Sequence, residues 1–191
     1  MPKPSKREQL VEATKELLWE VGFESMSPRD IQARSAARPG SLYHHFPSKL
    51  ALAGAAMDEL AQADIQRVNA IFATDAPAMD TLERYLLSKK DATRGCRFGR
   101  LAYETSIEHD ELRQPVAAIF DAVRTNFAAT LVRAQAEGTL RPGVDPDKLA
   151  VTLLATVQGG WVLARSYQDE SIARQAMEGA LSLLREASVD D

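Results

Sequence analysis

The side chains best suited to chemistry lie between Ser27 and Lys49, in the stretch SPRDIQARSAARPGSLYHHFPSK. A small residue such as Gly40 lets the backbone approach a ligand, and hydroxyl and imidazole groups can hydrogen-bond to DNA base edges or phosphates. Cationic side chains neutralise phosphates. This chemistry favours insertion into a DNA major groove. We predict DNA contacts from Ser27, Arg29, Arg38, Pro39, Gly40, Ser41, Tyr43, His44 and Lys49.

Two short helices joined by a tight turn would position these side chains. Ser27 is suited to cap the first helix, because its hydroxyl can accept from free backbone amides, and Pro28 fits the first helical position. Residues 35–37 are small enough for a sharp turn. The second helix is expected over residues 39–46, with apolar side chains four residues apart facing inward. The pattern predicts a helix-turn-helix.

The stretch LVEATKELLWEVGFESMSPRDIQARSAARPGSLYHHFPSKLAL resembles the N-terminal DNA-binding domain of the TetR family of transcriptional repressors. The resemblance rests on Gly22-Phe23, the helix start at Ser27, and the run GSLYHHFPSK from Gly40 to Lys49. The family usually has glycine in place of Ala36, and a small hydroxyl and a basic residue in place of Arg38-Pro39. Arg38 is therefore expected to make the first phosphate contact. The resemblance implies a repressor that is released from DNA by a small effector.

Metal and catalytic sites are less well supported. His44 and His45 have no Cys, His or Asp partner three or four residues away, which argues against a metal site. An acidic group at an expected helix break has no accompanying nucleophile or phosphate-binding loop. We therefore expect no enzymatic activity, no metal and no cofactor. The acidic group consists of Glu104, Glu108, Asp110 and Glu111, with His109 among them.

The single cysteine, Cys96, suggests an alternative mode of regulation. It lies in the sequence Arg-Gly-Cys-Arg, near the start of an expected helix. Arginine neighbours and helix N-termini lower the pKa of a thiol, which favours an electrophile- or oxidant-sensing repressor. A buried and inert cysteine is the simpler interpretation. A small helical ligand carrier or enzyme remains a further alternative.

Charge is unevenly distributed along the 191 residues, whose net charge is −4. Residues 1–50 hold eight Lys and Arg against six Asp and Glu, a net charge of +2, and the remaining 141 residues carry −6. A basic head on an acidic body is typical of a DNA reader with a separate regulatory domain. No apolar run is long enough to span a membrane, the N-terminus lacks the apolar core of a signal peptide, and a lone cysteine suits a reducing compartment. We expect a cytoplasmic protein.

Helical periodicity extends through the whole chain, which predicts an all-α protein of about nine helices. We expect a helix-turn-helix domain over residues 5–50 and a ligand-binding and dimerisation domain over residues 51–187. The helices outside residues 27–46 are expected at 5–21, 48–72, 79–90, 100–108, 111–137, 146–167 and 171–187.

The second domain is expected to form both an effector pocket and a dimer interface. By resemblance to the family, aromatic and apolar side chains would enclose a small apolar or aromatic effector. The predicted pocket residues are Tyr85, Phe98, Tyr103, Phe120, Val123, Phe127 and Trp161. An apolar stripe with two consecutive glycines suggests a close helix contact, either between two protomers or within one chain. The predicted dimer residues are Leu149, Leu153, Val157, Gly160 and Ala164.

Overall fold

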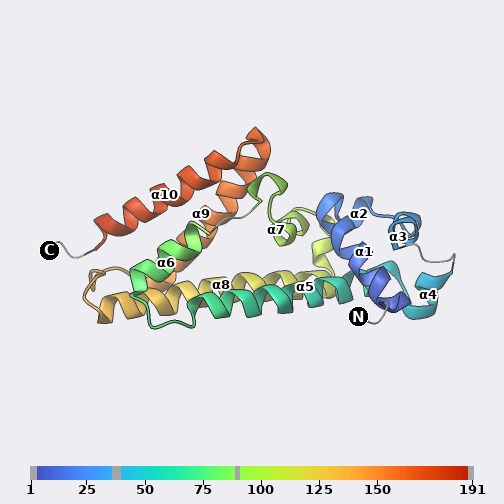
Figure 1. The fold of residues 1–191 in the computed structure, drawn as a ribbon, viewed down its shortest axis with the longest axis horizontal. Helices are drawn as coiled ribbons and strands as arrows, with labels where there is room; N and C mark the ends of the chain where they lie inside the picture. The colour runs from blue at the N-terminus through green and yellow to red at the C-terminus, as the bar shows by residue number, and fades with distance from the viewer. Residues whose placement is uncertain (1–3, 36–39, 89–90, 189–191) are drawn as a thin grey trace. The chain divides into compact units, whose positions relative to one another are not determined.

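The computed structural model describes residues 4–35, 40–88 and 91–188 (Figure 1). These residues form ten α-helices and two 3-10 helices without a β-strand, which confirms the all-α prediction. No helix of the described residues is long and apolar enough to cross a membrane. The elements are α1 Lys6–Glu20, α2 Gly22–Ser25, α3 Pro28–Ser35, α4 Ser41–His45, α5 Lys49–Phe72, α6 Ala78–Leu86, η1 Ala92–Arg94, α7 Arg97–Leu101, η2 Thr105–Glu108, α8 Asp110–Ala136, α9 Pro146–Tyr167 and α10 Glu170–Glu186.

The chain packs as two compact units, and each unit combines separate parts of the sequence. The first unit contains residues 1–64 and 97–119, and the second contains residues 65–96 and 120–191. Helices α5 and α8 therefore contribute to both units. The predicted boundary at residue 50 falls inside the first unit and stays a prediction.

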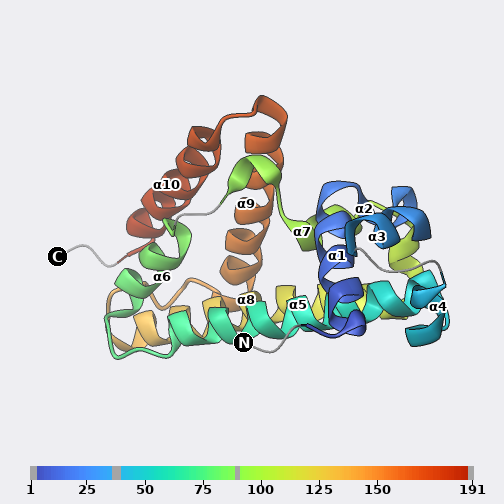
Figure 2. The same cartoon turned by 45° about the vertical axis from the view of Figure 1, so that its right-hand side comes forward.

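The first unit is built around α1, which packs against α2, α3, α4 and α7 (Figure 2). Ser5 begins α1 with a reciprocal cap: the Glu8 amide donates to the Ser5 hydroxyl at 3.2 Å, and the Ser5 amide donates to the Glu8 carboxylate at 2.7 Å. Such a cap satisfies two amides that otherwise lack partners. The buried stripe of α1 includes Leu10, Leu17 and Leu18, whereas Val21, directly after the helix, is 37% exposed.

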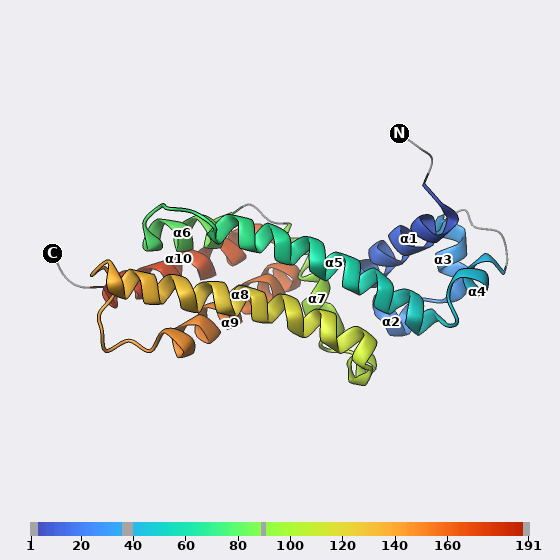
Figure 3. The same ribbon diagram turned by 90° about the horizontal axis from the view of Figure 1, so that it is seen from below.

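The second unit is held by an aromatic cluster and by the α9–α10 pair. The rings of Phe72, Tyr85 and Phe127 lie with centroids 5.1 to 5.9 Å apart. Asn126 of α8 donates to Asn69 of α5 at 2.8 Å, where the two helices run side by side (Figure 3). Helices α9 and α10 pack along each other, and η1 packs on both.

Two expected helices differ from the structure. The helix expected over 79–90 ends at Leu86, where the Ser88 hydroxyl donates to the Tyr85 carbonyl at 2.7 Å and satisfies an acceptor of the last turn; residues 89 and 90 lie outside the described residues. The helix expected over 100–108 is wrong. In its place α7 ends at Leu101 and η2 begins at Thr105, because Glu104 between them has an extended backbone.

The side chain of Glu104 explains this interruption. Its carboxylate accepts from the Glu24 amide at 3.0 Å and from the Ser106 hydroxyl at 3.2 Å, and the Ser106 amide donates to the Glu24 carboxylate at 3.0 Å. We call this reciprocal pairing of Glu24, Glu104 and Ser106 the glutamate clasp. It joins α2, which the sequence did not predict, to the turn before η2. Local bonds of this kind compete with helix formation.

Gly22 makes room for the glutamate clasp. A Cβ atom at this position would overlap a Glu104 carboxylate oxygen and lie 2.9 Å from its carboxyl carbon. The φ of Gly22 is +84°, a left-handed conformation that disfavours any side chain. Gly40 has the same φ of +84°, but a Cβ there would have nothing within 4 Å among the residues that the structure describes, which leave out 36–39. Comparing the same substitution at the two glycines therefore distinguishes the cost of backbone strain from the cost of a steric clash.

We predict that Gly22→Ala destabilises the protein more than Gly40→Ala. The left-handed backbone costs about 1–2 kcal/mol at either position. The clash adds about 1–3 kcal/mol at Gly22 alone. The free energy of unfolding, measured in urea, gives both values. Adding Glu104→Ala to Gly22→Ala should recover part of the loss through the coupling of neighbouring sites. Equal losses for the two glycine variants would contradict the role assigned to the clasp.

Candidate nucleic-acid interface

Helix α3 begins with a closed hydrogen-bond loop between Ser27 and Asp30. The Ser27 amide and hydroxyl donate to the Asp30 carboxylate at 2.8 and 2.6 Å, and the Asp30 amide is 3.3 Å from the Ser27 hydroxyl. These bonds, the one from the Ser27 hydroxyl foremost, lower the pKa of the Asp30 carboxyl group. The Ser27 hydroxyl thus caps α3, as predicted, and its contact with DNA stays a prediction.

The connection between α3 and α4 ends at Gly40. The predicted contacts Arg38 and Pro39 lie in the segment 36–39, outside the described residues. Gly40 precedes the first residue of α4 with φ +84° and ψ −15°, and it is exposed. A glycine takes this backbone conformation without strain, and its exposed backbone has no side chain that would keep a ligand away.

Helix α4 separates an inward face from an outward face within five residues. Leu42 is fully buried and Phe46, directly after the helix, is nearly so. Tyr43 is 59% exposed, and His44 beside it is exposed. Ser41 is half-buried. The outward side chains therefore stand free to meet a ligand, in the arrangement that major-groove reading requires.

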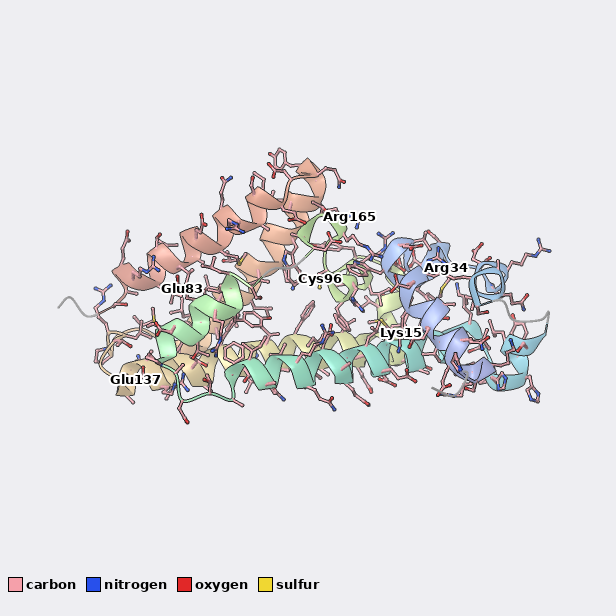
Figure 4. All side chains as sticks on the ribbon, in the orientation of Figure 1. Lys15, Arg34, Glu83, Cys96, Glu137 and Arg165 are labelled. Atoms are coloured by element: carbon pink, nitrogen blue, oxygen red, sulfur yellow. The ribbon has the colours of Figure 1, made fainter. Side chains whose placement is uncertain are left out.

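The arginine side chains near the N-terminal helices differ in whether a carboxylate already pairs with them. Arg34 pairs with Glu20 at 2.7 Å, which raises the pKa of the guanidinium (Figure 4). Arg7 lies 3.6 Å from the Glu59 carboxylate. Arg29, at the start of α3, is exposed and has no ion pair or hydrogen bond within the described residues. Arg29 is thus available for a phosphate.

Lys49 has an internal role in the structure. Its ammonium donates to the carbonyls of Phe23 and Met26 at 2.9 and 3.0 Å, and it lies 4.0 Å from the centroid of the Phe23 ring. These contacts fasten the start of α5 to the end of α2. Two of the three ammonium protons already have acceptors, so the predicted phosphate contact would use the third or exchange these bonds.

The predicted pocket residues are divided between packed core and surface. Phe98 is buried in α7 of the first unit, while Tyr85, Val123 and Phe127 are buried in the second unit. Phe120 and Trp161 are half-buried. Tyr103 is 82% exposed, so its assignment to a pocket is wrong: it falls in the turn after α7, where the expected helix is interrupted.

Most of the predicted dimer stripe is covered within one chain. Leu153, Val157 and Ala164 of α9 are buried. A Cβ on Gly160 would lie 2.9 Å from the Met177 side chain and 3.2 Å from Ala176 of α10. The close helix contact exists, but α10 makes it, so these residues are not a free dimer surface. The reason is that periodicity identifies a buried face without identifying what covers it. Leu149 is half-buried at the start of α9.

Cys96 is half-buried between η1 and α7 (Figure 4). The pKa of the neighbouring Tyr85 is raised to about 12, first by burial and then by the charge of a Cys96 thiolate. A sensing role for Cys96 stays a prediction. Within the described residues, no group of three or more His, Cys, Asp or Glu could hold a metal ion.

Comparison with known proteins agrees with this arrangement. Residues 10–56 match the family of bacterial regulatory proteins of the tetR type, and residues 77–180 match a tetracyclin repressor-like C-terminal domain. The chain is 31% identical over 157 residues to the HTH-type transcriptional repressor DhaR of a Mycobacterium species, covering 80% of this chain and 79% of that protein. It is also 31% identical over 175 residues to the HTH-type transcriptional regulator UidR of Escherichia coli, covering 89% and 85%.

Solved structures show the same fold over nearly the whole chain. A TetR transcriptional regulator from Chloroflexus aurantiacus is 26% identical, with a TM-score of 0.84 and 96% of each chain covered. The reduced form of NemR from E. coli is 21% identical, with a TM-score of 0.81 over 97% of this chain and 98% of that chain. The second likeness concerns the fold alone.

We predict that Arg29→Ala weakens DNA binding through loss of a phosphate contact, whereas Arg34→Ala has a much smaller effect. Removing one phosphate contact should reduce the slope of log affinity against log salt by about one per head. Arg34 is the matched control, because it lies on the same helix and its charge is already neutralised by Glu20. Fluorescence anisotropy of a labelled duplex over a salt series measures both slopes. Equal slopes for the two variants would remove Arg29 from the interface.

Proposed function

The chain belongs to the TetR family of transcriptional regulators, and we propose that it is a ligand-responsive repressor that binds a near-palindromic operator as a homodimer. The observation that carries this proposal is the division of α4 into two faces: Tyr43 and His44 are exposed, while Leu42 is buried. A relative of 31% identity that bears the name of a repressor supports the direction of regulation. In this proposal, the effector of the chain is a small molecule and the chain acts in the cytoplasm.

A homodimer follows from an apolar face that the chain leaves open. In the described part of the chain, a Cβ atom added to Gly159 of α9 or to Gly179 of α10 would have nothing within 4 Å, unlike one added to Gly160. Near these glycines, α9 exposes Val162 and Leu163, and α10 exposes Leu183, which is 68% accessible. Open glycines and exposed aliphatic side chains suit the close approach of another helix. A second copy of the chain supplies α9 and α10 again, which completes a four-helix interface.

Dimerisation provides the affinity that one head lacks. Two heads related by a two-fold axis read two half-sites about one DNA turn, or a multiple of it, apart. The operator should therefore be a near-palindrome. Effector binding favours a conformer in which the two heads no longer match the half-site spacing. Because this coupling is reciprocal, the operator must weaken effector binding by the same factor.

The direct test is selection of random duplex DNA by the purified full-length protein at near-physiological salt. Recovery of a near-palindromic motif supports a dimeric sequence reader, and binding to it should fall steeply as salt rises. A motif without two-fold symmetry would overturn the homodimeric mode of reading. No enrichment, with a folded protein, would overturn the repressor proposal.

We predict that Leu183→Glu dissociates the dimer and lowers operator affinity. A carboxylate buried without a partner in an apolar interface is strongly unfavourable. Sedimentation should then give a monomer at micromolar concentration, and loss of the second half-site should lower operator affinity about 100-fold or more. Val132→Glu is the control, because Val132 is an exposed aliphatic residue of α8 and does not belong to the two helices that carry the open glycines. If Leu183→Glu remained a dimer, this face of α10 would be excluded from the dimer interface.

A further inference from the structure

A cavity of about 310 Å³ lies in the second unit, among the end of α6, η1, α9 and α10. Its volume falls at the lower end of the roughly 300–1,000 Å³ that ligand sites occupy. Trp161 of α9 and Leu86 and Met177 from the two neighbouring helices form part of its apolar wall. Of the seven aromatic and apolar residues that the sequence assigned to a pocket, Trp161 is the one found here.

Two other predicted pocket aromatics, Tyr85 and Phe127, pack against each other. Phe127 is fully buried, and its ring makes edge contacts with Phe72 and Tyr85, with centroids 5.9 and 5.1 Å away. Rings at these separations pack against one another, as in a core. A ligand that took the place of these rings would have to displace them. The cavity beside Trp161 requires no such displacement.

The polar lining of the cavity carries balanced charge. Among its described residues are one cation, Arg174, one anion, Glu170, and the hydroxyls of Ser88 and Ser171. A charged ligand group would be attracted by one of the two ionic side chains and repelled by the other. A neutral hydroxyl can hydrogen-bond to the serines and to either ion without an unpaired charge, and a neutral carbonyl can accept from the serines or from Arg174. The lining therefore selects for an uncharged amphipathic molecule.

The cavity also touches the segment that leads to α7. Ala92 of η1 lines the cavity and is itself buried. The Arg165 guanidinium donates to the Arg94 carbonyl and so fastens η1 to α9 (Figure 4). Only Gly95 and Cys96 separate η1 from α7 in the sequence. A ligand that moves Ala92 thus acts on a short, anchored connection.

We propose that this cavity is the effector site, and that it binds a small, uncharged molecule with one aromatic ring and one hydroxyl or carbonyl group. The ring lies against Trp161 and Met177, and the polar group meets the side of Ser171 and Arg174. This inference rests on the proposed function and specifies the site and the chemical class of its effector. The bound ligand presses on Ala92 and biases the position of η1.

The chain offers a direct reporter, because Trp19 and Trp161 are its two tryptophans. Trp19 lies in the first unit, where the guanidinium carbon of Arg97 is 4.4 Å from the centroid of the Trp19 ring. In the Trp19→Phe variant, fluorescence excited at long wavelength comes from the cavity wall alone. Three probes of one ring size differ in charge: benzyl alcohol, benzoate and benzylamine. Calorimetry on the unaltered protein with the same probes gives an independent measure of binding.

Benzyl alcohol should change the Trp161 fluorescence saturably and bind about tenfold or more tightly than benzoate or benzylamine, because either ion would be desolvated beside a side chain of its own charge as well as one of the opposite charge. Ser171→Phe and Ser88→Leu, which fill the cavity from two sides, should each abolish the saturable change. Glu178→Phe is the control, about two turns beyond Ser171 along α10 and outside the lining. Saturable binding that survives both filling variants would overturn the proposal, as would equal affinity for the three probes or no binding of benzyl alcohol.

The outcomes for site and function are separable. Operator binding by the ligand-free Ser171→Phe and Ser88→Leu variants should match that of the unaltered protein. Normal operator binding without any probe binding would overturn the proposal that this cavity is the effector site and would leave the proposed function standing. Probe binding with no sequence-specific DNA binding in any variant would overturn the proposed function.

Discussion

A five-residue helix cannot maintain itself in water, because helix nucleation fixes several residues for few hydrogen bonds. Helix α4 is such a helix, and its conformation depends on the burial of Leu42 and Phe46 against the rest of the head. Burial of these two side chains sets the rotation of the helix, since residues three and four apart share a face. The same rotation exposes Tyr43 and His44. The surface that we propose reads DNA is therefore a consequence of apolar packing on the opposite side of the helix.

Polar contacts add what apolar packing cannot provide, namely the attachment of irregular segments. The Lys49 ammonium fastens α5 to the carbonyls at the end of α2, and the glutamate clasp fastens α2 to the turn before η2. Both attachments satisfy backbone groups that a short helix leaves without partners. They also place part of the chain from beyond residue 96 within the same compact unit as the head. A shift of the backbone in that later segment would therefore act on α2 through hydrogen bonds within one unit.

The sequence predicted the features that depend on local patterns. The long helices and the cap at Ser27 follow from periodicity and capping chemistry, and the structure confirms them. The interruption at Glu104 could not be foreseen, because it depends on a carboxylate that meets Glu24, eighty residues earlier in the sequence. Tyr103 was misplaced for the same reason. No local signal identified the cavity beside Trp161, since its walls come from four elements.

Helix α9 illustrates why a pattern of apolar residues underdetermines an interface. It is apolar on two faces: Leu153, Val157 and Gly160 are buried against the same chain, while Val162 and Leu163 remain exposed. A helix that is apolar on more than one side requires more than one partner. The adjacent glycines mark the division, because Gly160 meets α10, whereas a Cβ on Gly159 would meet nothing within 4 Å among the described residues. Trp161 follows them and borders the cavity. One helix thus joins the internal core, the open face and the cavity wall, so a shift of α9 in response to a ligand would alter the surface offered to a second protomer.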